Sequence, residues 1–278
     1  MSDANDSIHS WIDCLKNTPI PVLKHTAREL NRLKNDEAHL STRAISAIVL
    51  DDPFMVFKVI IYAKTHQGRH QMQDLVQVEQ AILMMGTEAF FNHLSLEPLV
   101  EDQLKNNIPA LTHLLRLIKR AHRAAFYAGD WAAIHKDLHS EEVRIAALLH
   151  DLAEMFMWCF APNKMNQIFA MQHADKTLRS KIAQEQVFGF KLQDLQKELI
   201  ETFHLPAILT RLIEEDEYND YRTKNVSLAV NLARHSANGW NDAALPDDYR
   251  DIAEFLRVDI ERAKYIIGVP NTSESTLK

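Results

Sequence analysis

Apolar side chains recur at helical spacing along almost the whole chain, and few residues interrupt that pattern. The 278 residues include only 6 Gly and 9 Pro, which is few for a protein made of many strands and tight turns. In 24–34, for example, Ala27, Leu30 and Leu33 form one apolar stripe flanked by charges. No stretch keeps the alternation that is typical of a strand, and no internal repeat is present. The sequence therefore predicts an all-α fold made of many helices.

Two helix starts can be predicted from local chemistry. Asp52 is a good N-cap and Pro53 suits the first helical position, so a helix is expected to begin there. The stretch 76–96 is expected to form two short helices that are interrupted near Gly86, with Thr87 as the cap of the second.

Further helices are expected over about 110–129 and 141–159. Between these and the preceding helices lies the polar stretch 101-EDQLKNNIP-109, the best candidate for an internal boundary. We therefore expect an amino-terminal helical subdomain over 8–105, a second helical subdomain over 106–270 and a disordered tail over 271–278.

Charge and cysteine content limit the classes of function. The formal net charge of −7 at pH 7 argues against nucleic acid or an anionic membrane as the main partner. No apolar run approaches the length of a bilayer span, and the first residues lack the form of a signal peptide. Cys14 and Cys159 are the only cysteines, so neither a disulfide framework nor a thiolate zinc site is expected. These features favour a cytoplasmic protein with reduced thiols.

One helix carries a stripe of basic residues. Arg116, Lys119, Arg120 and Arg123 fall at positions i, i+3, i+4 and i+7, so their side chains share a face. The stripe could bind a phosphate-bearing ligand such as a nucleotide, or it could simply be a solvated helix face.

The pair His150-Asp151 lies within the apolar stretch 146-AALLHDLAEMFMW-158. That stretch is apolar nearly all round, as expected of a helix that passes through a core. An ionised carboxylate left alone there would cost several kcal/mol, so Asp151 is expected to be paired, metal-bound or at a cavity wall.

His122 is a plausible partner for this pair. It shares a helix face with apolar residues and is therefore expected to point inward. Those apolar residues are Leu115, Ile118 and Phe126. Two packed helices could bring His122, His150 and Asp151 together. Imidazole and carboxylate suit a divalent metal such as Zn, Mn or Fe, which can acidify a bound water for attack on a phosphate ester. The alternative is a hydrogen-bonded pair that anchors helices with no metal.

Several segments, taken in order, resemble the HDOD family, the HD-related output domain of bacterial signalling proteins. The resemblance covers roughly 15–240 and is carried by 18-TPIPVLKHTARELNRL-33, 51-DDPFMVFKVIIYAKTH-66, 78-VEQAILMMGTEAFFNHL-94, 145-IAALLHDLAEM-155 and 200-IETFHLPAILTRLI-213. It implies an all-α fold whose second half is related to HD-type metal-dependent phosphohydrolases. It also places His122 at the position of an upstream helical His of the family.

This chain departs from the family pattern around the implied metal site. Where family members commonly have a His-His pair, it has 214-EEDEYND-220, and Asn231 stands where the superfamily has its last Asp ligand. Ala153 and Glu154 replace the usual Gly and Lys after the pair, and Glu154 is a substitute ligand only if it reaches the site from one turn along. The resemblance therefore implies a degenerate metal site in which Asp151 is kept as a polar anchor.

These observations leave three classes of function open. The first is a non-catalytic regulatory or signal-transduction module of bacteria, which acts on a signalling protein partner, as a homodimer or through a small ligand. The second is a phosphohydrolase of a nucleotide or cyclic dinucleotide, in which His122, His150 and Asp151 hold Mn, Fe, Zn or Mg and 116–120 meets phosphate. The third is a sensor that binds a nucleotide without cleaving it.

Overall fold

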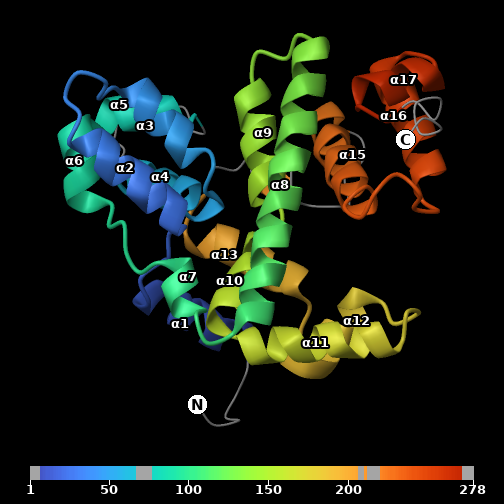
Figure 1. Cartoon of the computed structure of the whole chain (residues 1–278), viewed down its shortest axis with the longest axis horizontal. Helices are drawn as coiled ribbons and strands as arrows, with labels where there is room; N and C mark the ends of the chain where they lie inside the picture. Colours follow the sequence, from blue (N-terminus) through green and yellow to red (C-terminus); the bar gives the residue numbers. More distant parts are fainter. Residues whose placement is uncertain (1–6, 67–76, 206–209, 212–219, 271–278) are drawn as a thin grey trace, which may run out of the picture. The chain divides into compact units, whose positions relative to one another are not determined.

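The computed structural model describes residues 7–66, 77–205, 210–211 and 220–270. The tail expected over 271–278 lies outside the described residues. Within them the regular structure is helical throughout, and the sole extended pairing is an isolated parallel bridge between Val22 and Leu99 (Figure 1). The all-α prediction is confirmed.

The chain divides into two compact units. Unit 1 comprises the described residues of Met1–Lys119 and Asp151–Arg211, and unit 2 those of Arg120–His150 and Leu212–Lys278. Each unit is therefore built from separate stretches of the chain. The subdomain boundary that the sequence suggests near 105 and 106 stays a prediction.

Unit 1 contains two sets of packed helices. In the first set α3 packs on α2, α4 and α5, and α5 also packs on α6 (Figure 1). In the second set α13 packs on α1 and α10, and α11 packs on α10 and α12. The helices are α1 (Ile8–Asn17), α2 (Lys24–Lys34), α3 (Thr42–Val49), α4 (Pro53–Thr65), α5 (Val78–Met85), α6 (Thr87–His93), α7 (Val100–Gln103), α10 (Leu152–Phe160), α11 (Pro162–Ala174), α12 (Ser180–Phe188) and α13 (Leu192–Thr202).

Phenylalanine rings join the two sets within the core of unit 1. Phe54 and Phe57 of α4 are fully buried and lie 5.4 and 5.5 Å from the ring of Phe156 of α10. Phe57 also lies 5.2 Å from the ring of Phe203, directly after α13. Aromatic pairs of this kind add to the stabilisation that apolar burial already gives.

Both predicted helix starts are present, one with a different cap. The Asp52 carboxylate accepts hydrogen bonds from the backbone N–H groups of Phe54 and Met55, at 2.9 and 3.2 Å, which confirms Asp52 as the N-cap of α4. The interruption near Gly86 is also confirmed, because α5 ends before it and α6 begins after it. The cap of α6 is Gly86 itself rather than Thr87, since the turn needs a φ of +84° that glycine adopts without strain.

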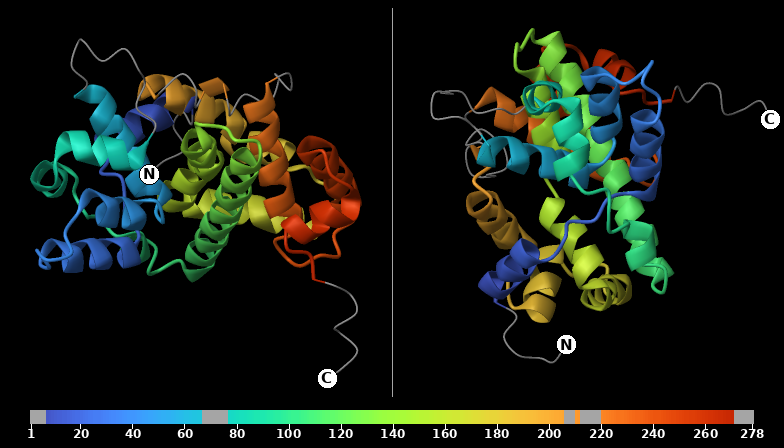
Figure 2. Two further views of the ribbon diagram at one scale, coloured as in Figure 1. Left: turned by 90° about the horizontal axis from the view of Figure 1, so that it is seen from above. Right: turned by 90° about the vertical axis from the view of Figure 1, so that its left-hand side faces the viewer.

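Unit 2 is organised around an aromatic cluster. The helices that lie wholly within its described residues are α9 (Ser140–Leu149), α15 (Tyr221–His235), α16 (Leu245–Leu256) and α17 (Ile260–Ile266). Of these, α15 packs on both α9 and α16 (Figure 2). Trp131 is fully buried and its ring contacts those of Tyr127 and Phe255. Phe255 in turn stacks on Tyr221 with ring centroids 5.0 Å apart.

The long helix α8 (Ile108–Ile134) extends beyond the expected 110–129 at both ends. Its residues up to Lys119 belong to unit 1 and those from Arg120 belong to unit 2. Asn107 caps the start of α8: its side-chain Oδ1 accepts a hydrogen bond from the backbone N–H of Ala110 at 3.2 Å.

Candidate functional site

His150 and Asp151 lie between two helices rather than inside one. The expected helix over 141–159 is wrong in this respect, because α9 ends at Leu149 and α10 begins at Leu152. His150 keeps a helical backbone, whereas Asp151 leaves it with φ −102° and ψ 28°. Both residues are half-buried, so the pair does not lie in a fully buried helix as the sequence suggested.

The interruption has a local and a distant cause. Asp is a poor residue for a helix interior, and Asp151 occupies the N-cap position of α10, although its side chain makes no capping hydrogen bond. The Asp151 carbonyl accepts the hydrogen bond of Met155 N–H at 3.1 Å, which starts α10. Gln196 of α13 is only 3% exposed, and its Oε1 accepts the N–H of Ala153 at 2.6 Å. A side chain 43 residues away therefore satisfies a donor that the first turn of α10 leaves open.

His122 lies on α8 and is half-buried. The prediction that its apolar neighbours face inward is wrong for two of the three, since Leu115 is 41% and Phe126 is 66% exposed while Ile118 is buried. The buried side of this part of α8 is instead rich in alanine. These residues are Ala121, Ala124, Ala125, Ala128 and Ala132. Small side chains let neighbouring helices approach closely. The sequence prediction, which took the large apolar residues to face inward, therefore chose the wrong face of α8.

Asn231 lies on α15, and its side-chain oxygen is already engaged. The guanidinium of Arg234, one turn along, donates to Asn231 Oδ1 at 2.6 Å. An amide oxygen is a weaker metal ligand than a carboxylate, and the cation hydrogen-bonded to it opposes the approach of a second cation. The amide of Asn231, with Arg234 bound to its oxygen, therefore does not have the chemistry of a metal ligand.

Within the described ranges, no three His, Cys, Asp or Glu side chains form a group that could hold a metal ion. The ligand set His122, His150 and Asp151 stays a prediction. Glu154, the suggested substitute, is half-buried in the first turn of α10.

The basic stripe divides into side chains of different kinds. Arg116 and Lys119 are exposed and Arg120 is half-buried. Arg123 is part of the packing of unit 2, because it donates to Ser236 O at 3.2 Å and lies over the ring of Trp240. Binding of a phosphate-bearing ligand by Arg116, Lys119 and Arg120 stays a prediction.

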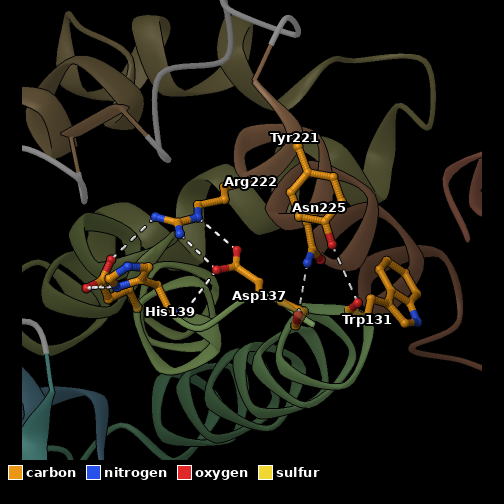
Figure 3. A network of polar contacts seen from close by, with 8 residues as sticks. Trp131, Asp137, His139, Tyr221, Arg222 and Asn225 are labelled. Atoms are coloured by element: carbon orange, nitrogen blue, oxygen red, sulfur yellow. Dashed lines mark hydrogen bonds and ion pairs between the residues drawn. The ribbon is translucent and has the colours of Figure 1, made fainter. Parts of the chain in front are cut away.

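A polar network in unit 2 joins the connection between α8 and α9 to the start of α15 (Figure 3). Arg222 donates from Nε and Nη2 to the two carboxylate oxygens of Asp137, both at 2.8 Å. Its Nη1 lies 3.7 Å from Glu142, which pairs with His139 at 3.0 Å. We call Asp137, His139, Glu142 and Arg222 the Arg222 cluster.

Electrostatics in the Arg222 cluster favour the charged forms. Burial raises the pKa of Asp137, but the hydrogen bonds and charge of Arg222 outweigh it, and the net pKa is lowered. The same hydrogen bonds raise the pKa of Arg222. Sequence reasoning missed this cluster because its main partners are 85 residues apart and no local pattern links them.

A second buried carboxylate lies in unit 1. Asp52 is fully buried and, besides capping α4, accepts a hydrogen bond from Leu23 N–H at 2.8 Å. Burial raises its pKa to about 6, although the backbone donors of Leu23, Met55 and Phe54 oppose the rise. The sequence identified Asp52 as a cap but not as the residue that holds the segment before α2.

Lys58 completes this arrangement. Its ammonium donates to the carbonyl of Ile20 at 3.2 Å and to the carbonyl of Ser95. Burial lowers the pKa of Lys58 to about 8, and the charge of Asp52 opposes that shift. We call Asp52, Lys58 and the backbone groups of Ile20, Leu23 and Ser95 the Asp52 cluster. It ties two connections to the start of α4.

In the part of the chain that the structure describes, no single helix has the length and apolar character needed to cross a membrane. One bent pair, Ser140–Phe160 with Pro162–Ala174, passes that test by length and composition alone.

Comparison with protein families gives one match. A family model described as HDOD domain matches residues 20–218. No curated protein matches the chain.

Solved structures with a similar fold span nearly the whole chain. A virulence factor from Campylobacter jejuni subsp. jejuni is 14% identical with a TM-score of 0.69, and the similarity covers 98% of this chain and 100% of that one. The MmoQ response regulator from Methylococcus capsulatus str. Bath is also 14% identical with a TM-score of 0.66, over 90% of this chain and 98% of that one. At this level of identity the likeness shows a shared fold.

Proposed function

The chain belongs to the HDOD family, and on that premise we propose that it is a non-catalytic regulatory module of bacterial signal transduction. It works in the cytoplasm through contacts with a signalling protein, with a second copy of itself or with a small bound ligand. The pair His150-Asp151 then serves as a polar anchor at the junction of α9 and α10, in a degenerate HD-type metal site.

The observation that carries this proposal is the state of Asn231. The resemblance to HD-type enzymes puts the last metal ligand there, yet the residue is an amide whose oxygen accepts a hydrogen bond from Arg234 at 2.6 Å. A hydrolase of this type needs a tightly held metal to acidify its water. Replacing one carboxylate of a four-ligand set by a neutral amide beside a guanidinium lowers affinity for that metal sharply.

The fold comparison supports the signalling role. The MmoQ protein, which shares the fold over 90% of this chain, is described as a response regulator. That description applies to MmoQ itself, and here it supports a role in signalling for a chain of the same family and fold.

The test is metal content and phosphoester turnover on the same protein. The purified chain is exposed to Mn, Fe, Zn and Mg, dialysed, and its metal content per chain measured by mass spectrometry. Nucleoside phosphates, cyclic dinucleotides and bis-p-nitrophenyl phosphate then serve as substrates. We expect far less than one metal per chain and no metal-dependent release of product. Robust turnover that disappears in Asp151→Ala would overturn the proposal and establish the phosphohydrolase alternative.

The variant Asn231→Asp tests the carrying observation directly. It restores a carboxylate next to Arg234, so metal content should rise above that of the unmodified chain. Asn163→Asp, an exposed change of the same kind on α11, is the matched control and should leave metal content unchanged. Equal metal content in the two variants would mean that Asn231 does not stand at a ligand position.

A further inference from the structure

A histidine and a buried carboxylate join two helices of unit 2. His235 is the last residue of α15, and its Nδ1 lies 2.7 Å from Oδ2 of Asp248, in the first turn of α16. Asp248 is only 8% exposed, whereas the side chain of His235 is 24% exposed. The carboxylate is therefore enclosed, and the imidazole ring reaches the surface.

This hydrogen bond determines which ring nitrogen is reactive. A carboxylate ion only accepts hydrogen bonds, so Nδ1 of His235 carries the ring proton and Nε2 of the neutral ring keeps a lone pair. In the described part of the chain, Nε2 has no hydrogen-bond partner and is not enclosed. An imidazole that a carboxylate orients in this way can act as a metal ligand, a general base or a nucleophile.

The surroundings of His235 favour the nucleophile. A metal site needs further ligands, and the described ranges contain no group of three His, Cys, Asp or Glu side chains that could hold a metal ion. A general base that activates a protein nucleophile needs a hydroxyl or thiol within hydrogen-bond reach, and no such group of the described residues bonds to Nε2. A nucleophile needs only Nε2 itself and a group that stabilises the positive ring formed on modification.

Two other histidines that pair with carboxylates differ in this respect. His39 lies 2.9 Å from Asp36, but both side chains are exposed, at 78% and 47%. His139 lies 3.0 Å from Glu142, but the charge of Glu142 is shared with Arg222. The carboxylate that holds the ring at the end of α15 is, by contrast, buried and hydrogen-bonded to the imidazole.

A positive charge on the ring of His235 is stabilised in two ways. Burial raises the pKa of Asp248, and the hydrogen bond and charge of His235 oppose that rise, so the buried carboxylate gains from a cationic partner. The ring also belongs to the last residue of α15, where the helix dipole favours a cation.

The other charged groups near the pair cancel one another. Asp251 and Arg234 act on the carboxyl of the pair with opposite signs. Asp247 and Arg250, both exposed, form an ion pair. Arg234 is exposed and gives one donor to Asn231, which leaves further N–H groups for an anion. A small anion can therefore approach the ring despite the net charge of −7.

We propose that His235 is a phosphoryl acceptor, modified at Nε2 by an acyl phosphate and positioned by Asp248. The lone pair of Nε2 attacks phosphorus, the bond from phosphorus to the acyl oxygen breaks, and the carboxylate leaves with its electron pair. Nε2 carries no proton, so none is displaced, and the positive ring that forms keeps its Nδ1–H on Asp248. Arg234, adjacent to His235 in the chain, is the cation for the phosphoryl oxygens.

An acyl phosphate suits this site because it is already activated. Phosphoryl transfer depends mainly on positioning and on charge stabilisation, so one nucleophile with a nearby cation can receive the group. The same chemistry comes from two sources, a free molecule such as acetyl phosphate and the phosphorylated Asp of another protein. His235 and Asp248 lie outside the residues 20–218 that the family model matches, so the inference goes beyond the proposed function.

The test treats the purified full-length chain with acetyl phosphate that carries a radioactive phosphoryl group. We expect label that is lost in acid and kept in alkali, as for a phosphorus–nitrogen bond, and mass spectrometry at neutral pH should locate it on His235. His235→Gln should lose the label. Asp248→Asn keeps an acceptor for Nδ1–H but lacks the charge, so the rate of labelling should fall about tenfold or more.

His139→Gln is the matched control, because its imidazole also pairs with a carboxylate, and it should be labelled as fast as the unmodified chain. Thermal melting verifies that the three variants fold, and the position of the label in the unmodified chain depends on no variant. Absence of label, label on another residue, or equal rates for Asp248→Asn and the unmodified chain overturns the inference.

Chain isolated from cells that cannot make acetyl phosphate separates the two sources. A phosphoryl group on His235 in these cells indicates a protein donor, and one found only in cells that make acetyl phosphate indicates the free molecule. Its absence from both kinds of cell overturns the inference.

The two proposals fail in different assays. Metal-dependent phosphoester turnover would contradict the proposed function while leaving the label on His235 in place. Absence of label would contradict the phosphoryl acceptor and leave the non-catalytic role untouched.

Discussion

The Asp52 cluster of unit 1 and the Arg222 cluster of unit 2 perform the same structural task with opposite electrostatics. In each, a carboxylate ties a connection to the start of a helix. Asp52 is fully buried, its nearest donors are backbone N–H groups, and its pKa is raised to about 6. Asp137 is held by a guanidinium through two hydrogen bonds, and its pKa is lowered.

The difference shows that a buried carboxylate can be stabilised by dipoles or by a counter-charge, with different consequences. Backbone donors satisfy hydrogen bonds but only partly offset the loss of water, so the charged form of Asp52 stays costly. A guanidinium supplies both hydrogen bonds and charge, so the charged form of Asp137 is favoured. The contributions of these two carboxylates to stability should therefore change in opposite directions when pH falls.

The largest effect should come from Asp52→Ala. It leaves three backbone N–H groups without their acceptor, so the free energy of unfolding should fall by about 3 to 4 kcal/mol. Chemical denaturation measures it. The neighbouring exposed Asp51→Ala is the control and should change stability by less than about 0.5 kcal/mol. A loss as small as in the control would mean that Asp52 does not hold the segment before α2.

The pH dependence should separate the two carboxylates. The folded-state pKa of Asp52 is about two units above its usual 3.8, so stability rises as pH falls through about 6, with a ceiling of about 3 kcal/mol. The pKa of Asp137 is lowered, so its contribution is present at neutral pH and is lost on acidification. Unfolding free energies of the unmodified chain and Asp52→Asn should be compared between about pH 7 and about pH 4. Those of the unmodified chain and Asp137→Asn should be compared between about pH 5 and about pH 2, because the lowered pKa of Asp137 lies below its usual 3.8.

Relative to Asp52→Asn, the unmodified chain should gain stability as pH falls from about 7 to about 4. Relative to Asp137→Asn, it should lose stability as pH falls from about 5 to about 2. If the change in unfolding free energy on acidification had the same sign relative to both variants, the two carboxylates would not differ in their electrostatics as described.

Arg222→Ala should have an intermediate effect. Removing the cation leaves Asp137 and Glu142 half-buried with like charges, which should cost about 2 kcal/mol of unfolding free energy. The control is Arg250→Ala, which removes an exposed pair with Asp247 and should cost less than about 0.5 kcal/mol. Similar losses in the two variants would indicate that the Arg222 cluster behaves as an ordinary surface ion pair.

The smallest loss of unfolding free energy should come from Gln196→Leu. Because its hydrogen bond involves no charged group, this variant is a reference for the two carboxylate clusters. It removes the acceptor of Ala153 N–H and should cost about 1 kcal/mol. This loss should be the same across the pH range, because neither partner titrates. Gln167→Leu, an exposed change on α11, is the control. A loss that varies with pH would show that the junction at Asp151 is coupled to a charged group.

The parts of the fold that could be predicted from sequence depend on neighbours in the chain. The all-α architecture follows from periodicity, and the cap at Asp52 and the interruption at Gly86 follow from residues within a few positions. The inner face of α8 could not be predicted by the same means. There the large apolar residues Leu115 and Phe126 are exposed, because alanines occupy the packed side.

The candidate site shows the same limit. The sequence indicated that His150 and Asp151 matter, but it placed them within one helix. The interruption depends on Gln196, whose acceptor comes from 43 residues away, and the contact of Arg222 with Asp137 spans 85 residues. Long-range contacts of this kind leave no local pattern, and the assignment of Asn231 to a ligand position, which rests on the family resemblance alone, stays a prediction.

The packing of α1 on α13 has a consequence for how the chain is made. Ile12 and Leu15 of α1 are buried in the finished protein, yet their packing partner α13 begins only at Leu192. At about 5 to 20 residues per second, a ribosome needs roughly 10 to 35 s to travel from one helix to the other. For that time α13 is not available to cover the apolar face of α1. A chaperone that shields α1 during synthesis should therefore raise the yield of folded protein more than one that acts after release.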